Sequence, residues 1–323
     1  MPPSTRSRFT LCVPALVLAA ALGFPLAAAD VDAEPDVDLS LARQGQPFTN
    51  SIGMKFAPIP TGKFMMGTTE EERDAVRIAI GSKAQPDWLK AEGPRHQVEL
   101  TKDFFMGVYE VTQKQYKDVM GSNPSYFRKD GGGAALVRGM DTGDFPVDSV
   151  SWDDAQEFCK KLSELPAEKK AGRKYRLPTE AEWEYGCRAG ADVKEPFTFD
   201  KPSTSASSTQ ANFAGNQPYG GGAEGPHLGR TCKVGSYRAN PFGLYDMHGN
   251  VWEWCLDWYD SREYGRKDRR DPRGPVAGQR RVLRGGMWNA GGRNCRSGYR
   301  VYDSPGFHGN SYGFRVVRVL RDG

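Results

Sequence analysis

The sequence predicts an α+β protein that is rich in loops and has short antiparallel strands. Glycine and proline are frequent, with 38 and 22 residues among 323, which indicates many turns and little regular secondary structure. The apolar runs are short and end at Gly, Pro or Asp, as short strands do. Such strands are expected within 54–67, 96–101, 104–111, 281–288 and 312–320.

Helices are indicated by residues that cap their N-termini. Thr112 with Gln115 and Thr179 with Glu182 form capping boxes, in which the side chains at the cap and three residues later bond each other's backbone. Ser151 caps a third helix. The expected ranges are 112–121, 151–162 and 179–190, with a fourth helix at 69–81. Between residues 194 and 238 regular patterning disappears, and loops of that length are either functional or held by other parts of the protein.

The first 29 residues have the features of an export signal. Arg6 and Arg8 precede an apolar run, and Ala27 to Ala29 form a small-residue cleavage site. A membrane anchor is the alternative, but the two prolines and the modest length of the run favour cleavage. We therefore expect a signal peptide at 1–29, an acidic flexible leader at 30–48 and one folded domain at 49–320. The mature protein is expected to be periplasmic or secreted.

Charge and cysteine content limit the function classes. The chain has 44 basic and 40 acidic residues, and the loss of Arg6 and Arg8 with the signal leaves it nearly neutral. This balance argues against nucleic acid or a membrane surface as the main partner. Five cysteines follow the signal, and an exported compartment permits disulfides. There is no CxxC motif, so a dithiol redox site or a zinc ribbon is not expected.

Seven segments carry a resemblance to one family. In order they read NSIGMKFAPIPTGKFMMG, FFMGVYEVTQKQY, PVDSVSWDDAQEFC, YRLPTEAEWEYGCRAG, NPFGLYDMHGNVWEWC, RVLRGG and YGFRV. As an ordered set they resemble the formylglycine-generating enzyme, or sulfatase-modifying factor, family over essentially all of 50–320. The resemblance implies a C-type-lectin-like fold with little regular secondary structure. It also implies an oxidase that converts a sulfatase cysteine to formylglycine, using dioxygen and copper.

The resemblance implies structural calcium in the segment 240–255. Carried over by position, the ligands are the side chains of Asp246 and Glu253 and the carbonyls of Gly249 and Val251. Calcium accepts such mixed oxygen ligands. The alternative from the residues alone is that Asp246 caps a turn and Glu253 forms a salt bridge. A second calcium site is implied at Asn212 and Phe213, although its later Asp ligand has no counterpart here.

The copper site of the family is incomplete in this chain. Its two cysteines follow RGG in a C-x-x-x-x-C arrangement, and here these positions hold Ala290 and Cys295. Linear ligation of copper(I) needs two thiolates, so copper is not expected as a cofactor. Cys295 also resembles a structural cysteine of the family, whose disulfide partner corresponds to Cys187. A Cys187–Cys295 disulfide is therefore expected, with a catalytic Cys295 as the alternative.

Three functions remain open from the sequence. The first is binding or modification of an extracytoplasmic peptide or protein without copper-dependent cysteine oxidation. The second is an active sulfatase-modifying oxidase, with a sulfatase as partner. The third is a ligand-binding module like the lectin-fold proteins that retroelements diversify. Their variable face corresponds here to a surface with Trp288, Asn289, Arg293, Asn294 and Tyr299, residue types common in recognition surfaces. For Trp288 and Tyr299, ordinary core packing is an equal alternative.

Overall fold

The fold is known from a computed structural model that describes residues 45–266 and 269–319. The signal peptide expected at 1–29 lies outside the described residues, as does most of the expected leader at 30–48. Within the described residues, no helix has the length and apolar character needed to cross a membrane.

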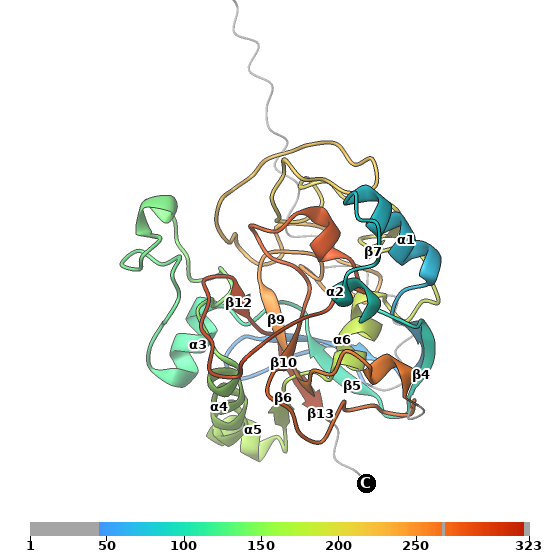
Figure 1. The fold of residues 1–323 in the computed structure, drawn as a ribbon. Coiled ribbons are helices and arrows are strands. Elements are labelled where there is room, and N and C mark those ends of the chain that lie inside the picture. The colour runs from blue at the N-terminus through green and yellow to red at the C-terminus, as the bar shows by residue number, and fades with distance from the viewer. Residues whose placement is uncertain (1–44, 267–268, 320–323) are drawn as a thin grey trace, which may run out of the picture. The chain divides into compact units, whose positions relative to one another are not determined.

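Two small sheets form the centre of the fold (Figure 1). The first has the strand order β1 (Phe48–Thr49), β2 (Lys55–Ile59), β5 (Phe104–Gly107), β13 (Val317–Val319) and β6 (Lys174–Arg176), all antiparallel. The second has the order β11 (Val301–Asp303), β10 (Arg281–Arg284), β9 (Trp252–Trp258) and β12 (Tyr312–Gly313). In this second sheet β12 runs parallel to β9, and the other pairs are antiparallel.

Two further strand pairs lie outside these sheets. They are β3 (Gly62–Met66) with β4 (His96–Leu100), and β7 (Phe197–Thr198) with β8 (Pro202–Ser203). The β7–β8 pair lies inside the long segment 194–238, which otherwise has no helix or strand. The loop-rich α+β class predicted from the sequence is confirmed.

Four of the α-helices begin where the sequence predicted. The α-helices are α1 (Glu70–Ala79), α2 (Asp87–Lys90), α3 (Gln113–Met120), α4 (Trp152–Glu164), α5 (Pro166–Lys170) and α6 (Glu180–Cys187). The two short ones, α2 and α5, were not predicted. Short 3₁₀ helices are η1 (Ala134–Val137), η2 (Glu263–Gly265) and η3 (Gly292–Cys295). Thr69, Thr112, Ser151 and Thr179 each form a capping box. Helix α6 ends at Cys187, three residues before the predicted end at Gly190.

Helix α6 is surrounded by the rest of the protein. All eight of its residues are buried, and it packs against β3, β9 and β10. Trp183 and Cys187 join a large apolar cluster, while Glu180, Glu182 and Glu184 are buried with them. Buried carboxylates need hydrogen-bonded partners, so this helix requires cationic side chains from other segments.

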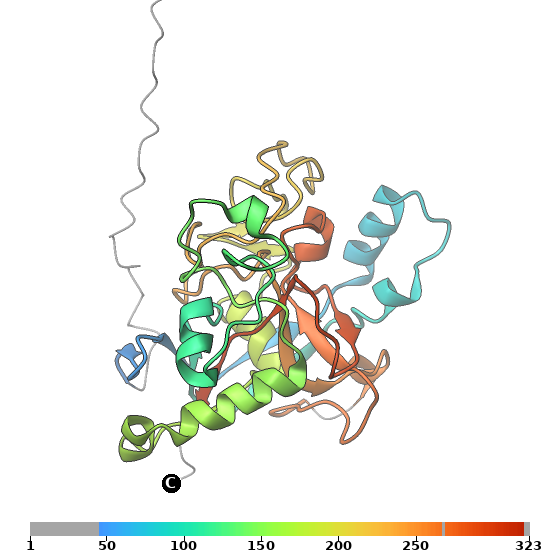
Figure 2. The same ribbon diagram turned by 90° about the vertical axis from the view of Figure 1, so that its left-hand side faces the viewer.

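Helices α1 and α2 belong to an insertion, residues 69–91, that leaves and rejoins the core at one point and is called the α1–α2 excursion below. The Thr68 amide donates a hydrogen bond of 2.9 Å to the Glu92 carbonyl, which closes the chain at the base of residues 69–91. Figure 2 shows both helices projecting to one side of the sheets. Val76 and Leu89 are buried, and they anchor the excursion through its apolar side.

Candidate functional site

A groove of about 600 Å³ lies between α1 and the loops that carry η3. Its size is typical of pockets that hold a small molecule or a short segment of peptide. It is lined by Glu72, Ala75, Val76, Ala79, Ile80, Pro196, Thr204, Gln217, Pro218, Tyr219, Gly220, Gly291, Gly292, Arg293 and Arg296. One wall is a face of α1, and the opposite side comes from segments 217–220 and 291–296.

The two arginines that line the groove differ in their partners. Arg296 is buried and forms a bidentate ion pair with buried Glu92, at 2.7 and 2.8 Å. Arg293 is exposed and has no ion pair within the described residues. The charge of Arg296 is therefore balanced inside the protein, whereas that of Arg293 is available to a ligand.

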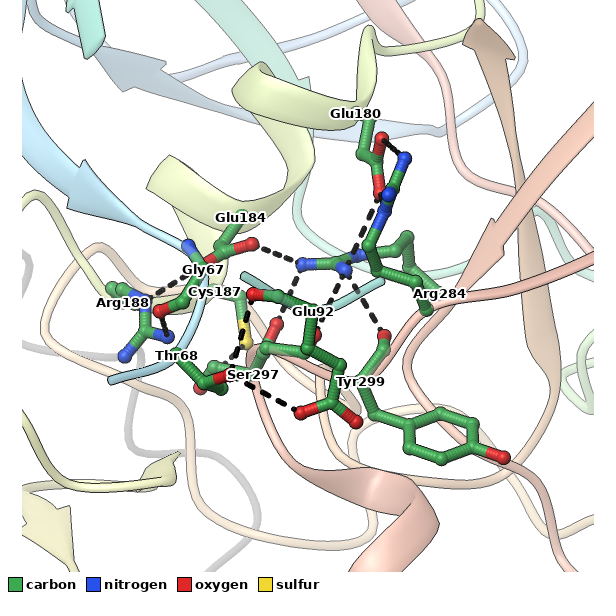
Figure 3. A network of polar contacts seen from close by, with 12 residues as sticks. Gly67, Thr68, Glu92, Glu180, Glu184, Cys187, Arg188, Arg284, Ser297 and Tyr299 are labelled. Carbon is green, nitrogen blue, oxygen red and sulfur yellow. Dashed lines mark hydrogen bonds and ion pairs between the residues drawn. The ribbon is translucent and has the colours of Figure 1, made fainter. Parts of the chain in front are cut away.

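A network of buried ion pairs holds α6 against the segment after β10 (Figure 3). Glu184 receives hydrogen bonds from Arg284, from Arg188 at 2.9 Å and from the Gly67 amide at 2.8 Å. These contacts lower the pKa of Glu184 despite its burial, with Arg284 and Arg188 as the main electrostatic causes. Arg284 also donates to the carbonyls of Ser297 and Tyr299 at 2.6 and 3.0 Å. The network thus fixes the chain that leads from η3 to β11.

Cys295 lies in the core next to the groove and not on its surface. Its side chain belongs to an apolar cluster with Phe197, Phe199 and Phe213, and Tyr219 packs against that cluster while it also lines the groove. Burial raises the pKa of the Cys295 thiol to about 12, so the neutral form dominates at neutral pH. Its Sγ packs closely on Gly286, where a Cβ would lie 2.4 Å from the sulfur.

The predicted disulfide between Cys187 and Cys295 is wrong for this structure. All five cysteines of the described residues are free thiols. The Sγ of Cys187 lies 3.5 Å from the Ser297 hydroxyl and 3.7 Å from Nε2 of His248. The Cys295 sulfur instead faces Gly286 and the Gly291 carbonyl, at 3.9 Å from that oxygen. The two sulfurs therefore have separate neighbours.

His248 connects the two cysteine-bearing segments as a neutral residue. Its Nε2 accepts a hydrogen bond of 2.9 Å from the Thr198 amide, so its Nδ1 carries the proton and donates to the Cys295 carbonyl at 2.8 Å. Burial lowers the pKa of His248 to about 4. The imidazole is thus a fixed structural link at neutral pH.

Glu253 forms the buried salt bridge that the sequence left open as an alternative. Its two carboxylate oxygens accept hydrogen bonds from Arg315 Nε and Nη2 at 2.6 and 2.7 Å. Trp183 Nε1 donates to the same carboxylate at 2.8 Å. The guanidinium of Arg315 therefore supplies the positive charge that allows a carboxylate to lie among buried aromatic rings.

Three of the predicted calcium residues line one small cavity of about 10 Å³, namely Asn212, Asp246 and Gly249. Asn212 Oδ1 is buried without a hydrogen-bond partner. Burial raises the pKa of Asp246 to about 6, and burial together with the Asp246 charge raises that of Glu110 well above its usual value. Oxygen donors with excess negative charge fit a calcium ion, so Asp246, Asn212 and the backbone at Gly249 are suited to hold one.

Val251 and Phe213, the other predicted backbone ligands, are both buried in the core. Gly249 is required at its position because a Cβ there would lie 2.5 Å from the Asn212 carbonyl oxygen, at a φ of +147°. This contact brings the two segments of the predicted calcium sites together. Calcium itself stays a prediction.

Comparison with known proteins places the chain in a family. The sequence model of the sulfatase-modifying factor enzyme 1-like domain matches residues 47–320. The chain belongs to the formylglycine-generating enzyme family. This membership confirms the resemblance drawn from the sequence motifs and the C-type-lectin-like fold that it implied.

Curated relatives of this family differ in their overall length. The chain is 30% identical over 283 residues to serine/threonine-protein kinase pkn1 of Chlamydia caviae, covering 81% of this chain and 38% of that protein. It is 37% identical over 176 residues to the formylglycine-generating enzyme of Streptomyces coelicolor, covering 53% and 52% respectively. The chain thus spans about half or less of the length of these relatives.

Two solved structures of the same fold resemble the chain over most of its length. PvdO from Pseudomonas aeruginosa is 30% identical with a TM-score of 0.64, covering 85% of this chain and 98% of that structure. Treponema denticola variable protein 1 is 26% identical with a TM-score of 0.64, covering 85% and 99%. Formylglycine-generating-enzyme-like folds therefore account for nearly the whole described region.

The structure divides the predicted binding surface of this family member into two parts. Asn289 and Arg293 are exposed, and Asn294 is partly exposed. Trp288 packs edge-on against Phe127 at 5.2 Å and donates a hydrogen bond to the Asn310 carbonyl. Tyr299 stacks on Trp252 at 5.8 Å. Trp288 and Tyr299 therefore have large packing roles, and Arg293 is the predicted residue that lines the groove.

Sequence reasoning missed the groove wall and the ion pair below it. The α1 helix was predicted, but its exposed Ala75 and Ala79 gave no sign that they line a groove. Glu92 and Arg296 are separated by 204 positions, so their pairing is a property of the fold.

Proposed function

We propose that this chain is an exported member of the family that binds an extracytoplasmic peptide or protein segment in the groove beside η3. The observation that carries the proposal is the groove itself, which has an apolar wall and an unpaired guanidinium from Arg293. Clefts with mostly apolar walls and few polar groups are common ligand sites.

The residues at the two copper-cysteine positions of the family argue against copper-dependent cysteine oxidation in this chain. Ala290 occupies the position of the first copper cysteine, and its carbonyl accepts a hydrogen bond from the Ala214 amide at 2.8 Å. Cys295 is a buried thiol with a raised pKa. One protonated thiol does not supply the two thiolates that copper(I) prefers.

We expect no oxidase activity on a sulfatase. Co-expression with a sulfatase that carries the unmodified cysteine, followed by mass measurement of its core peptide, should give only cysteine. Cys159→Ser, which alters a buried thiol in a different apolar cluster, is the matched control for Cys295→Ser. Formylglycine that appears with the wild type and with Cys159→Ser, but disappears with Cys295→Ser, would establish the oxidase alternative.

We also propose that a structural calcium ion is held by Asp246, Asn212 and the backbone near Gly249. A chelator should lower the melting temperature by about 5 °C, since calcium at 100 times its Kd adds about 2.7 kcal/mol. Asp246→Ala should abolish the difference between chelator and calcium. Asp118→Ala, which removes a carboxylate from the exposed Lys114–Asp118 pair, should retain it. Equal melting temperatures of the wild type in chelator and in calcium would contradict the site.

A further inference from the structure

We infer that the groove selects peptide segments in which an acidic residue is adjacent to an apolar one, with the carboxylate on Arg293 and the apolar side chain against α1. This inference rests on the proposed function and specifies its ligand. It follows from three features of the groove. These are the ion pairing of its charged residues, the exposed apolar surface of its walls, and the hydrogen bonds that fix the walls relative to each other.

Arg293 is the cationic residue of the groove that can contact an acidic ligand, because the other arginine already has an ion-pair partner. Arg296 is neutralised by Glu92, and both residues are buried. Glu72 accepts a hydrogen bond of 2.6 Å from the Thr69 amide, so it is engaged in capping α1. Within the described residues, Arg293 is thus the cationic residue of the groove whose charge has no ion-pair partner. A guanidinium of this kind binds a carboxylate through paired hydrogen bonds.

The wall of α1 provides the apolar half of the site. Ala75 and Ala79 lie one turn apart and are both exposed, although they line the groove beside Ile80. Their small side chains leave space that a larger apolar side chain can fill. Pro196, Pro218 and Tyr219 line other parts of the groove with further apolar surface. Contact with these surfaces removes apolar area from water on both partners, which favours binding.

The opposing sides of the groove are tied together at its base. Glu92 ends the α1–α2 excursion and also holds Arg296, which lies three residues after Arg293. The Arg296 Nε donates to the Arg293 carbonyl at 2.8 Å. The backbone position of Arg293 relative to the α1 excursion is therefore set by buried and partly buried hydrogen bonds. A preformed arrangement of this kind reduces the entropy cost of binding.

Selection from a phage-displayed library of random dodecapeptides tests the inference. The full mature chain is immobilised as wild type, Arg293→Glu, Arg293→Lys, Ala79→Arg and Arg138→Glu. Wild type should enrich peptides with Asp or Glu adjacent to an apolar residue. Enriched peptides, resynthesised with a fluorophore, should bind Arg293→Glu about five- to tenfold more weakly, because an attraction becomes a repulsion. Arg293→Lys keeps the charge but not the paired hydrogen bonds, so its affinity should lie between those of the wild type and Arg293→Glu. Ala79→Arg should lose the affinity by blocking the wall.

Arg138→Glu is the matched control, because Arg138 is an exposed arginine that does not line the groove. Its affinity for the enriched peptides should equal that of the wild type. Peptides that enrich without the acidic residue, or that bind Arg293→Glu as tightly as wild type, overturn the inference but leave peptide binding intact. Binding that survives Ala79→Arg places the peptide elsewhere and also overturns it. If no peptide enriches on the wild type, the proposed function itself fails.

Discussion

Replacing Arg315 with alanine is expected to lower the free energy of unfolding by about 3–5 kcal/mol, the usual effect of removing one partner from a buried ion pair. The substitution leaves the Glu253 carboxylate fully buried with only the Trp183 indole as a donor. It also removes the hydrogen bonds that Arg315 donates to the carbonyls of Gly107 and Tyr245, at 3.1 and 2.9 Å. Chemical denaturation of the purified protein measures the change.

The control for this prediction is an ion pair at the surface. Lys114 and Asp118 pair at 2.5 Å on α3 with much of both side chains exposed. Lys114→Ala is therefore expected to change stability by less than about 0.5 kcal/mol. Equal effects of Lys114→Ala and Arg315→Ala would mean that Glu253 is stabilised by something other than the guanidinium.

Asp257→Asn is expected to increase stability in alkaline solution. Burial and the neighbouring Glu180 carboxylate raise the pKa of Asp257 to about 8. Between pH 4 and 8 the folded state keeps a proton that the unfolded state releases, so stability falls as the pH rises through this range. Above pH 8 the loss amounts to about 6 kcal/mol at most. Asparagine has no such titration, and its amide oxygen can still accept the 2.8 Å hydrogen bond from the Glu180 amide.

Urea unfolding of the wild type and Asp257→Asn at pH 5 and pH 9 tests the predicted gain in stability at alkaline pH. The difference in unfolding free energy between the two proteins should grow in favour of the variant as the pH rises. Asp118→Asn changes an exposed carboxylate and should give the same difference from the wild type at both pH values. An advantage of Asp257→Asn that stays constant with pH would show that Asp257 is ionised in the folded state throughout.

The sequence predicted the parts of the fold that depend on local interactions. The capping boxes at Thr112 and Thr179 marked helix starts correctly because each is completed within four residues. Strand β9 (Trp252–Trp258) was missed. It carries buried Glu253 and Asp257 among its aromatic residues, so it shows neither the alternation of a half-buried strand nor the uniform apolar character of a central one.

The candidate site is built from contacts between segments that are far apart in the sequence. The sequence alone did not predict these contacts. Cys187 and Cys295 were predicted to bond to each other because related chains pair such positions, but their sulfurs have different neighbours here. The partner of Glu253 is Arg315, 62 positions away. Local pattern identifies a carboxylate that needs a partner, whereas only the folded chain shows whether that partner is a metal ion or another side chain.

The closed base of the α1–α2 excursion has a consequence for how this protein can change. Residues 69–91 leave and rejoin the core where Thr68 and Glu92 are hydrogen-bonded to each other. Apart from its buried anchors Val76 and Leu89, this insertion is therefore little constrained by the sheets in length or sequence. Homologous hairpins could be exchanged between such proteins as cassettes, giving new ligand preferences on an unchanged scaffold.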